Sequence, residues 1–321
     1  MLGPFPSSDT RFMRRVRVHQ AWYRVCVLGV SSFGNLAVSG APCGSVLPDD
    51  AAERFLNFHG NAAIYRYLDR RTKGWGVDPI RCTKYLTSSQ TMSFNMLART
   101  VALPRECATA FNNMLGRTDF EWLESSDFEF AAQGSKYSLG DKTLLDILLR
   151  FRTTVGSTQV VAVETKLADR FSTRRTNGMS GDGYRQLAAQ SDTWHSLSAA
   201  LANNRTRQLA RCHSLAQSIQ AIDDGSVDQS ALIVLTHPDD EAARRSVAAY
   251  MMQVTNGTVV HRTWSEFLVS ANAAGALGRS DTDELSRRYV DLAWSAGMWR
   301  ELEQSTPSAV KVQGVGPNGT E

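Results

Sequence analysis

The segment KTLLDILLRFRTTVGSTQVVAVETKLAD, residues 142–169, decides the fold. Its two apolar runs predict two neighbouring strands, joined by a hairpin turn near residues 156–158. Asp146 interrupts the first run, and Glu164 and Lys166 end the second. Because side chains in a strand alternate between its two faces, we expect Glu164 and Lys166 to project from the same face.

These three charged residues need an explanation, because apolar strands have no packing reason to contain them. Burying an acid and an amine in a sheet costs several kcal/mol unless the groups pair or hold a metal ion. The simplest alternative is structural: Asp146 as a satisfied strand-end aspartate, and Glu164 with Lys166 as a surface ion pair. The apolar context of all three residues favours a functional site.

Composition indicates an ordinary globular protein. The chain has 321 residues, of which 42% are hydrophobic and 21% charged, and its formal net charge of +3 identifies no partner by itself. Its five cysteines are scattered and form no CxxC pair, which argues against a disulfide framework and against a thiolate zinc site. We therefore expect the protein to reside in the reducing cytoplasm. No apolar run reaches the roughly 18 residues of a membrane span, so we expect no membrane association.

The order of the remaining patterns predicts an α/β protein with a mixed central sheet flanked by helices. Outside the quoted segment, the expected elements are helices at 11–28 and 49–70, a helix opened by a capping box of Thr87 and Gln90, a short helix from Pro104, one or two strands within 120–133, helices at 183–201 and 205–221, a buried strand at 231–236, and helices from Pro238, at 264–274 and at 281–301. We divide the chain into a helical N-terminal extension (1–85), an α/β domain (86–302) and a disordered tail (303–321).

The residue types at the strand ends suit phosphodiester cleavage. Carboxylates such as Asp146 and Glu164 are ligands for a hard cation, Mg²⁺ or Mn²⁺, which stabilises the charge of a phosphoryl group. A lysine beside the cation, here Lys166, orients or helps to deprotonate the attacking water. We expect the cation and desolvation to lower the pKa of this lysine.

Three segments in this order carry a family resemblance: Ser88-Ser89-Gln90 with Phe94-Asn95, then Glu164-Thr165-Lys166, then the helix Arg207–His213. With them, residues 10–250 resemble the PD-(D/E)XK nuclease-like superfamily, in particular a bacterial branch of restriction-endonuclease-like proteins. The resemblance implies a restriction-endonuclease-like core, metal-dependent nuclease activity and nucleic acid, most simply DNA, as the partner.

The resemblance also assigns roles. Asp146 and Glu164 would hold the metal with the backbone carbonyl of Thr165, and Lys166 would position the water. The branch tends to follow this lysine with Tyr-Thr-Glu, where the chain has Leu-Ala-Asp, so Asp169 is expected only as a supporting acid.

Several further residues have both a functional and a structural interpretation. Gln208 and Arg211 share a helix face and would bind substrate, or would simply be solvated. Arg174 and Arg175 lie in a glycine-rich loop that suits backbone phosphates, although a solvated loop is the simpler expectation. Gln90 either supports the site or only completes its capping box. Three acids of the predicted strand would either supply a further metal ligand or lie on a solvated strand face, namely Glu121, Glu124 and Glu129.

A rival motif from another class follows the strand at 231–236. The sequence HPDDE resembles the metal-binding opening of zinc-dependent de-N-acetylases, in which His237 and Asp240 would bind zinc and Asp239 would act as the base. The distant His-x-x-His of that class is missing, and His261 stands alone. A strand followed by the N-terminus of a helix explains HPDDE without a metal.

A third hypothesis keeps the nuclease fold and drops catalysis, leaving a nucleic-acid-binding protein. The presence of Asp146, Glu164 and Lys166 together argues against it, because binding alone needs none of them.

Overall fold

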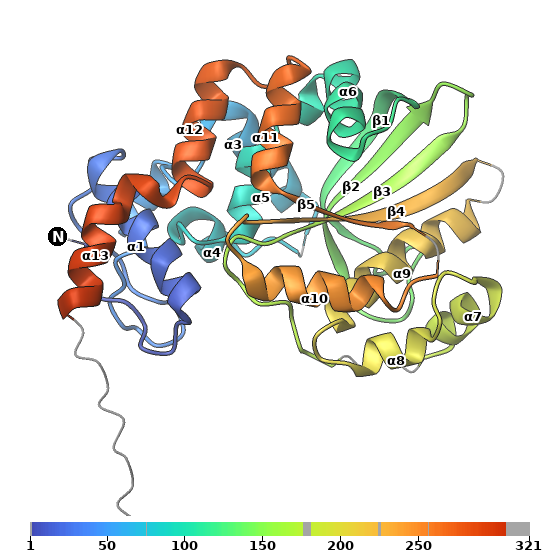
Figure 1. Cartoon of the computed structure of the whole chain (residues 1–321), viewed down its shortest axis with the longest axis horizontal. Helices are drawn as coiled ribbons and strands as arrows, with labels where there is room; N and C mark the ends of the chain where they lie inside the picture. Colours follow the sequence, from blue (N-terminus) through green and yellow to red (C-terminus); the bar gives the residue numbers. More distant parts are fainter. Residues whose placement is uncertain (1, 75, 176–180, 224–225, 256, 306–321) are drawn as a thin grey trace, which may run out of the picture.

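A five-stranded mixed sheet forms the centre of the molecule (Figure 1). The computed structural model describes residues 2–74, 76–175, 181–223, 226–255 and 257–305. The strands are β1 (Phe120–Ala131), β2 (Leu144–Thr153), β3 (Thr158–Thr165), β4 (Val227–Thr236) and β5 (Val259–Thr263), in that spatial order. β1, β2 and β3 are antiparallel neighbours, whereas β3, β4 and β5 are parallel. The predicted α/β class with a mixed sheet is therefore confirmed.

The hairpin of β2 and β3 has the predicted turn. Its last paired residues are Arg152 and Thr158, and Gly156 between them has φ +86°, a conformation that glycine adopts at little cost. The turn closes through a 2.9 Å hydrogen bond from the amide of Gly156 to the carbonyl of Thr153. All eight residues of β3 are buried, as its apolar sequence predicts.

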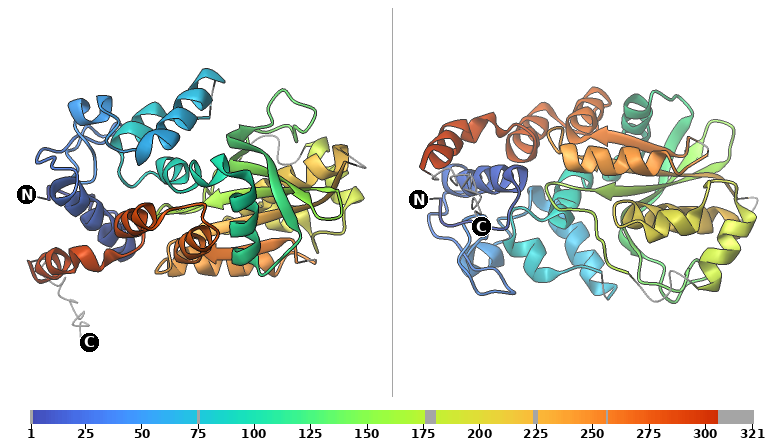
Figure 2. Two further views of the ribbon diagram at one scale, coloured as in Figure 1. Left: turned by 90° about the horizontal axis from the view of Figure 1, so that it is seen from above. Right: turned by 60° about the horizontal axis from the view of Figure 1, so that its bottom comes forward.

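Helices cover both faces of the sheet, so the core has two halves (Figures 1 and 2). The helices that contribute to the first half include α3 (Gly60–Thr72), α5 (Ser89–Leu97), α6 (Pro104–Leu115), α11 (Trp264–Ala273) and α12 (Arg279–Tyr289). The helices of the second half are α7 (Asp182–Gln190), α8 (Leu197–Ala202), α9 (Arg207–Ile222) and α10 (Glu241–Met251). Among the described residues, no helix is long and apolar enough to cross a membrane.

The beginning and the end of the described chain pack together. Helix α1 (Arg11–Cys26) lies beside η3 (Leu292–Ser295) and α13 (Ala296–Ser305), and every view shows them side by side (Figures 1 and 2). His19 of α1 is buried and bonds through its two ring nitrogens to the hydroxyl of Ser295, at 3.0 Å, and to the carbonyl of Arg287, at 2.8 Å. Residues from the predicted extension, such as Val16 and Tyr67, enter the same hydrophobic cluster as the sheet.

Several predicted helices are interrupted in the structure. The expected helix at 49–70 is divided into α2 (Asp49–Glu53) and α3, because Phe55 and Gly60 have positive φ angles of 56° and 74°. The stretch 183–201 is broken between α7 and α8, where Trp194 forms a β-bridge with Val254. The stretch 281–301 likewise becomes α12, η3 and α13.

Two other differences concern single elements. The strand β5 was not predicted; it is a five-residue edge strand whose residues are mostly half-buried and include His261 and Arg262. The tail predicted as disordered, 303–321, lies outside the described residues from 306 onward, and its first three residues complete α13.

Buried histidines make the stability of this fold depend on pH. Burial lowers the pKa of His213 to about 3, and burial likewise lowers the pKa of His19 and of His237 to about 4 each. In the unfolded chain a histidine takes up a proton below about pH 6.5. Between that pH and about 4 the unfolded state therefore binds more protons than the native state, and the free energy of unfolding falls as the pH falls.

We expect His213→Gln to weaken this dependence. The variant should lose stability at pH 7.5, because the ring bonds Tyr250 and Thr258 at 3.0 and 3.1 Å, but its free energy of unfolding should fall less steeply from pH 6.5 to 4, by about one proton's contribution. Urea unfolding at a series of pH values measures both effects. Replacing the exposed His195 by glutamine is the matched control, and an unchanged pH slope in His213→Gln would contradict the assignment.

Candidate active site

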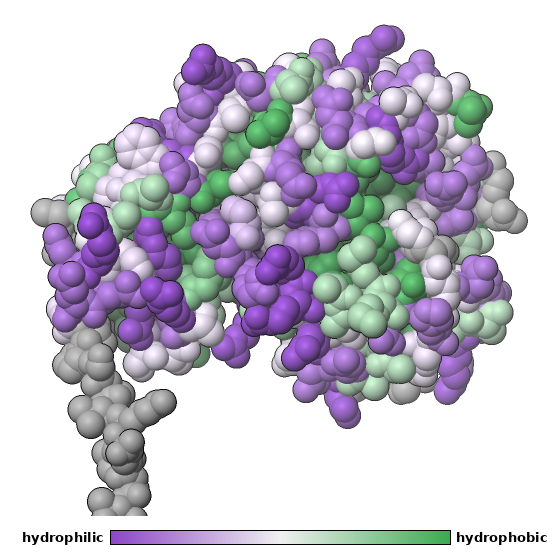
Figure 3. Space-filling view, in the orientation of Figure 1, coloured by the Kyte–Doolittle hydropathy of each residue, from purple (hydrophilic) through white to green (hydrophobic). Residues whose placement is uncertain are grey.

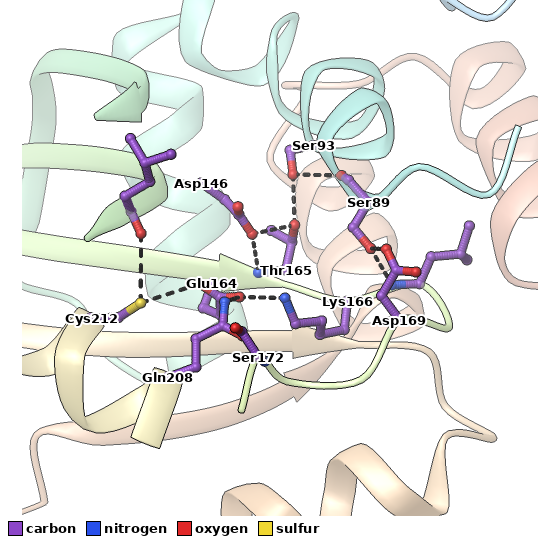
Figure 4. Close-up of polar contacts among 12 residues, drawn as sticks. Ser89, Ser93, Asp146, Glu164, Thr165, Lys166, Asp169, Ser172, Gln208 and Cys212 are labelled. Carbon is purple, nitrogen blue, oxygen red and sulfur yellow. Dashed lines mark hydrogen bonds and ion pairs between the residues drawn. The ribbon is translucent and has the colours of Figure 1, made fainter. Parts of the chain in front are cut away.

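The charged residues of segment 142–169 meet at one end of the strands, where β2 begins and β3 ends. Ile147 pairs with Val163 across the two strands, so Asp146 and Glu164 lie one step further along the same register. Figure 4 shows their side chains with Lys166 at the end of β3. The structure therefore brings the three residues together, as the sequence predicts.

Glu164 is 1% exposed and has hydrogen-bond donors on both carboxylate oxygens. Its Oε1 accepts bonds of 2.6 Å from Nζ of Lys166 and from Nε2 of Gln208. Its Oε2 accepts a 3.3 Å bond from Sγ of Cys212 (Figure 4). Gln208 and Cys212 are four residues apart on α9, so one face of this helix orients the carboxylate.

Asp146 is oriented from the opposite side, by the end of β3 itself. Its Oδ2 accepts bonds of 2.7 Å from the amide and from the hydroxyl of Thr165, and that hydroxyl lies 2.6 Å from Oγ of Ser93 on α5 (Figure 4). Burial and the charge of Glu164 raise the pKa of Asp146 to about 7, although Lys166 and the bonds from Thr165 counteract them.

Lys166 is a buried ammonium rather than a neutral amine. Burial lowers its pKa, but the carboxylates of Glu164 and Asp146 outweigh burial and raise the pKa above its usual value. The expectation that Lys166 has a lowered pKa is thus wrong for the metal-free protein. The Nζ atom also lies 5.4 Å from the centroid of the Phe171 ring, a cation–π distance.

Residues at the start of α5 face the segment that follows β3. Ser88 is the N-cap, and its side chain accepts from the amide of Thr91. Ser89 accepts a 3.0 Å bond from the amide of Leu167 and donates a 3.3 Å bond to Asp169, which Arg81 also approaches to 3.4 Å. Asp169 therefore fastens the chain beyond β3 to α5.

Gln90 does not form the predicted capping box with Thr87. Its Nε2 donates a 2.8 Å bond to the carbonyl of Gly76, and its Oε1 accepts bonds from Asp78 and Cys82 at 2.9 and 3.0 Å. The helix begins one residue later than predicted, which leaves this amide free to hold the 76–78 loop.

The predicted substrate-binding residues have different surroundings. Gln208 reaches Glu164 and accepts a 2.6 Å bond from the amide of Ser172. Arg211 instead pairs with buried Asp141, at 2.9 Å, so a structural role explains it better than phosphate binding. Arg174 and Arg175 are exposed, and part of their loop, 176–180, lies outside the described residues.

The three glutamates of β1 differ sharply. Glu121 is exposed, and Glu124 is an exposed residue that accepts a 2.9 Å bond from Thr158. Glu129 is 3% exposed, and burial, followed by repulsion from Asp146, raises its pKa well above the usual range. The solvated-face interpretation therefore fits Glu121 and fails for Glu129.

The HPDDE segment is a strand end followed by a helix cap. The ring of His237 accepts from the amide of Asp239 and lies 3.1 Å from the carbonyl of Val290. Asp240 is the N-cap of α10 and accepts a 2.9 Å bond from Ala243. Within the described ranges, no three His, Cys, Asp or Glu side chains form a metal-binding group. The zinc hypothesis thus has no structural support.

The side chains where β2 begins and β3 ends suit a hard divalent cation, because the acids there outnumber the positive charge of Lys166. Asp146 and Glu164 offer oxygen ligands, and Glu129 adds a third acid, whereas Lys166 is the buried cation that pairs with Glu164. Mg²⁺ is commonly held by one or two carboxylates, with water and phosphate as its other ligands. Lys166 and Gln208 already bond Glu164, so an incoming cation would compete with them for this carboxylate.

Sequence reasoning missed two residues that orient the site, Ser93 and Cys212. Their signal was helical spacing, since each is four residues beyond a residue already singled out, Ser89 and Gln208. Neither stands in a motif of its own, so only the packing of α5 and α9 against β3 reveals them.

The fold and this edge define a nuclease-like α/β protein with an acid-x-lysine strand. A family model described as the PD-(D/E)XK nuclease superfamily matches residues 7–291. The chain belongs to this superfamily, whose members are generally phosphodiester-cleaving nucleases that typically use divalent metals such as Mg²⁺. No curated protein and no solved structure matches the chain significantly.

Asp146 should make metal-free protein less stable as the pH rises. Its pKa is about 7 in the folded chain, against 3.8 ordinarily, so between these values the folded state holds a proton that the unfolded state has released. Stability from this group is therefore complete below about pH 4 and is lost as the pH rises towards 7. Asp146→Asn removes this pH-dependent loss of stability. The melting temperature of the variant, relative to that of wild type, should therefore rise steadily from pH 5 to 7.5.

Differential scanning fluorimetry with a chelator measures this difference. The exposed strand residue Asp228, replaced by asparagine, is the matched control and should show no such trend. A constant difference between Asp146→Asn and wild type across this pH range would show that Asp146 is already ionised throughout it.

Proposed function

We propose that the protein is a metal-dependent nuclease that hydrolyses phosphodiester bonds, with DNA as the expected substrate. The observation that carries the proposal is that half-buried Asp146 lies beside the buried pair of Glu164 and Lys166, where β2 begins and β3 ends. Membership of the nuclease superfamily supports it. The preference for DNA over RNA rests on the family resemblance alone.

The roles follow from the contacts. Asp146 and Glu164 would hold Mg²⁺ or Mn²⁺, with the backbone carbonyl of Thr165 as a further ligand. The cation would supply positive charge to the phosphoryl group and acidify a bound water. Thr165 and Ser93 fix the rotamer of Asp146, and Gln208 with Cys212 fixes that of Glu164. Such preorganisation reduces the entropy lost when the reacting groups are aligned.

Lys166 would act as a cationic positioning group. Its raised pKa keeps it protonated near neutral pH, so it is suited to holding the attacking water or a phosphate oxygen rather than to accepting a proton from water. Its partner Glu164 limits the rotamers of the ammonium. The general base is left to another group, including the substrate phosphate itself.

Phosphate contacts outside the metal site would come from exposed basic residues near the end of β3. Arg174 and Arg175 remain the candidates, and Gln208 would contact substrate only after releasing Ser172. Hydrophilic side chains also gather over the start of α10 (Figure 3), where Arg244 and Arg245 both pair with Glu241. These exposed pairs are weak and can exchange for a phosphate.

A second candidate function is nucleic-acid binding without cleavage. The observation in its favour is that Glu164 already has three donors, of which Lys166 and Gln208 share one oxygen. A protein that never takes up a cation would keep this arrangement. Tight DNA binding with no cleavage under Mg²⁺ or Mn²⁺ distinguishes this candidate.

Cleavage of DNA should require all three residues. We expect Asp146→Asn, Glu164→Gln and Lys166→Ala each to lower the rate by about a thousandfold, because each removes a charge that acts on the transition state. The assay compares single-stranded, double-stranded and branched DNA, and RNA, with Mg²⁺ or Mn²⁺. The exposed Asp228→Asn and Lys136→Ala serve as controls. Equal cutting by wild type and the three variants would exclude this site as the source of the activity.

Metal binding and catalysis should separate at Lys166. Lys166→Met removes a cation that repels the metal and occupies Glu164, so we expect about tenfold tighter Mn²⁺ binding together with lost cleavage. Isothermal titration calorimetry without nucleic acid measures the affinity. Weaker Mn²⁺ binding in Lys166→Met would contradict the competition described above.

A further inference from the structure

Glu129 lies in line with the two acids of the site. The flanking pairs Phe128–Ile147 and Phe130–Leu145 place Glu129 opposite Asp146 in the register of β1 and β2. Asp146 is in turn opposite Glu164, one step beyond the last pair of β2 and β3. The backbone positions of three acids therefore lie side by side on three adjacent strands, although the side chains of the described, metal-free chain form no metal-binding group of three.

Both β1 and β2 change faces at this level. Phe128 and Ile147 pack into one half of the core, whereas Phe130 and Leu145, two residues away in each strand, pack against the other half. Regular alternation would place residues two apart on the same face. The change is localised at Glu129 and Asp146, and in β1 it coincides with the left-handed backbone of Glu129.

Glu129 also carries costs that its surroundings offset only in part, through a side-chain hydrogen bond from Gln90 and the charge of Arg70, which both lower its pKa. Its φ of 49° is left-handed, which is unfavourable for a residue other than glycine. Its carboxylate is buried, and Oε1 has no hydrogen-bond partner. The guanidinium of Arg70 bonds the backbone carbonyl of Glu129, at 2.8 and 3.0 Å, and so holds the unusual backbone in place. A buried acid with an unpartnered oxygen is the arrangement expected when the missing partner is a ligand.

A pocket of about 230 Å³ opens beside this residue, between α3 and the end of β1. Its charged side chains include Glu129 itself and the basic residues Arg66, Arg70 and Lys73, with Asp69 and Asp127. Lys73 pairs with Asp69 at 2.9 Å. The pocket is open to solvent, and its lining includes Glu129 but neither Asp146 nor Glu164.

We propose that Glu129 is a third carboxylate of the cation site, which together with Asp146 holds a divalent cation on the side of the site facing α3. Water and a substrate phosphate oxygen from the pocket would complete the ligands of this ion. The inference rests on the proposed function, since it assumes that the site takes up a metal. It adds a residue that lies outside the acid-x-lysine pattern and comes from a different strand.

The test is Mn²⁺ binding to the whole chain without nucleic acid, measured by isothermal titration calorimetry. We expect Glu129→Gln to lose one bound Mn²⁺ or to weaken binding at least tenfold. The matched control, Glu121→Gln, changes the same residue type on an exposed position of the same strand and should bind as wild type does. In the presence of a chelator, Glu129→Gln should melt at or above the wild-type temperature, because it no longer buries an unpartnered carboxylate.

The outcomes separate this inference from the proposed function. If Glu129→Gln binds Mn²⁺ as wild type does while Asp146→Asn does not, Glu129 is outside the site and the proposed function stands. If wild type, Asp146→Asn and Glu164→Gln bind alike or not at all, the metal site of the proposed function fails, and this inference fails with it. A metal-free melting temperature of Glu129→Gln several degrees below wild type would make Glu129 a structural acid and would also overturn the inference.

Discussion

The ion pair of Glu164 and Lys166 is the constraint around which the rest of the structure is built. Both side chains are buried at the end of a strand that is otherwise apolar, and a buried pair is tolerated only if its remaining donors and acceptors are satisfied. Helix α9 meets this demand from one side of the sheet through Gln208 and Cys212. Helix α5 approaches from the other side, where Ser93 bonds Thr165 and Ser89 holds the chain beyond β3. Helix α9 thus bonds the ion pair itself, whereas α5 bonds the residues beside it, Thr165 and Leu167.

The sequence predicts the β2–β3 hairpin and its three charged residues because the signals are local. A period of two, a glycine at the turn and acids within apolar runs need no knowledge of distant residues. The partners of Gln90 and Arg211 were not predictable in this way. Each is decided by a group from elsewhere in the chain, the 76–78 loop in one case and Asp141 in the other. β5 escaped notice because five half-buried residues at a sheet edge give almost no periodic signal.

Glu129 shows a different limit of sequence reasoning. The sequence offers Glu121, Glu124 and Glu129 as equivalent acids on one predicted strand, and nothing in their spacing ranks them. Strand register, burial and a left-handed backbone separate them in the structure. A residue that destabilises its local structure without a compensating contact is often functional. A protein tolerates this loss of stability where its activity depends on the residue.

The packing of α1 against the last helices also has a consequence for the order of assembly during translation. His19 bonds Arg287 and Ser295, and Asn95 of α5 bonds the hydroxyl of Tyr289 at 2.6 Å. A ribosome makes these partners far apart in time, so a nascent chain lacks the Tyr289 contact of α5 until residue 289 has emerged. A product terminated before Tyr289 would contain Asp146, Glu164 and Lys166 but would lack this contact of α5. Synthesis therefore completes the packing of α1 and α5 only with the last described helices.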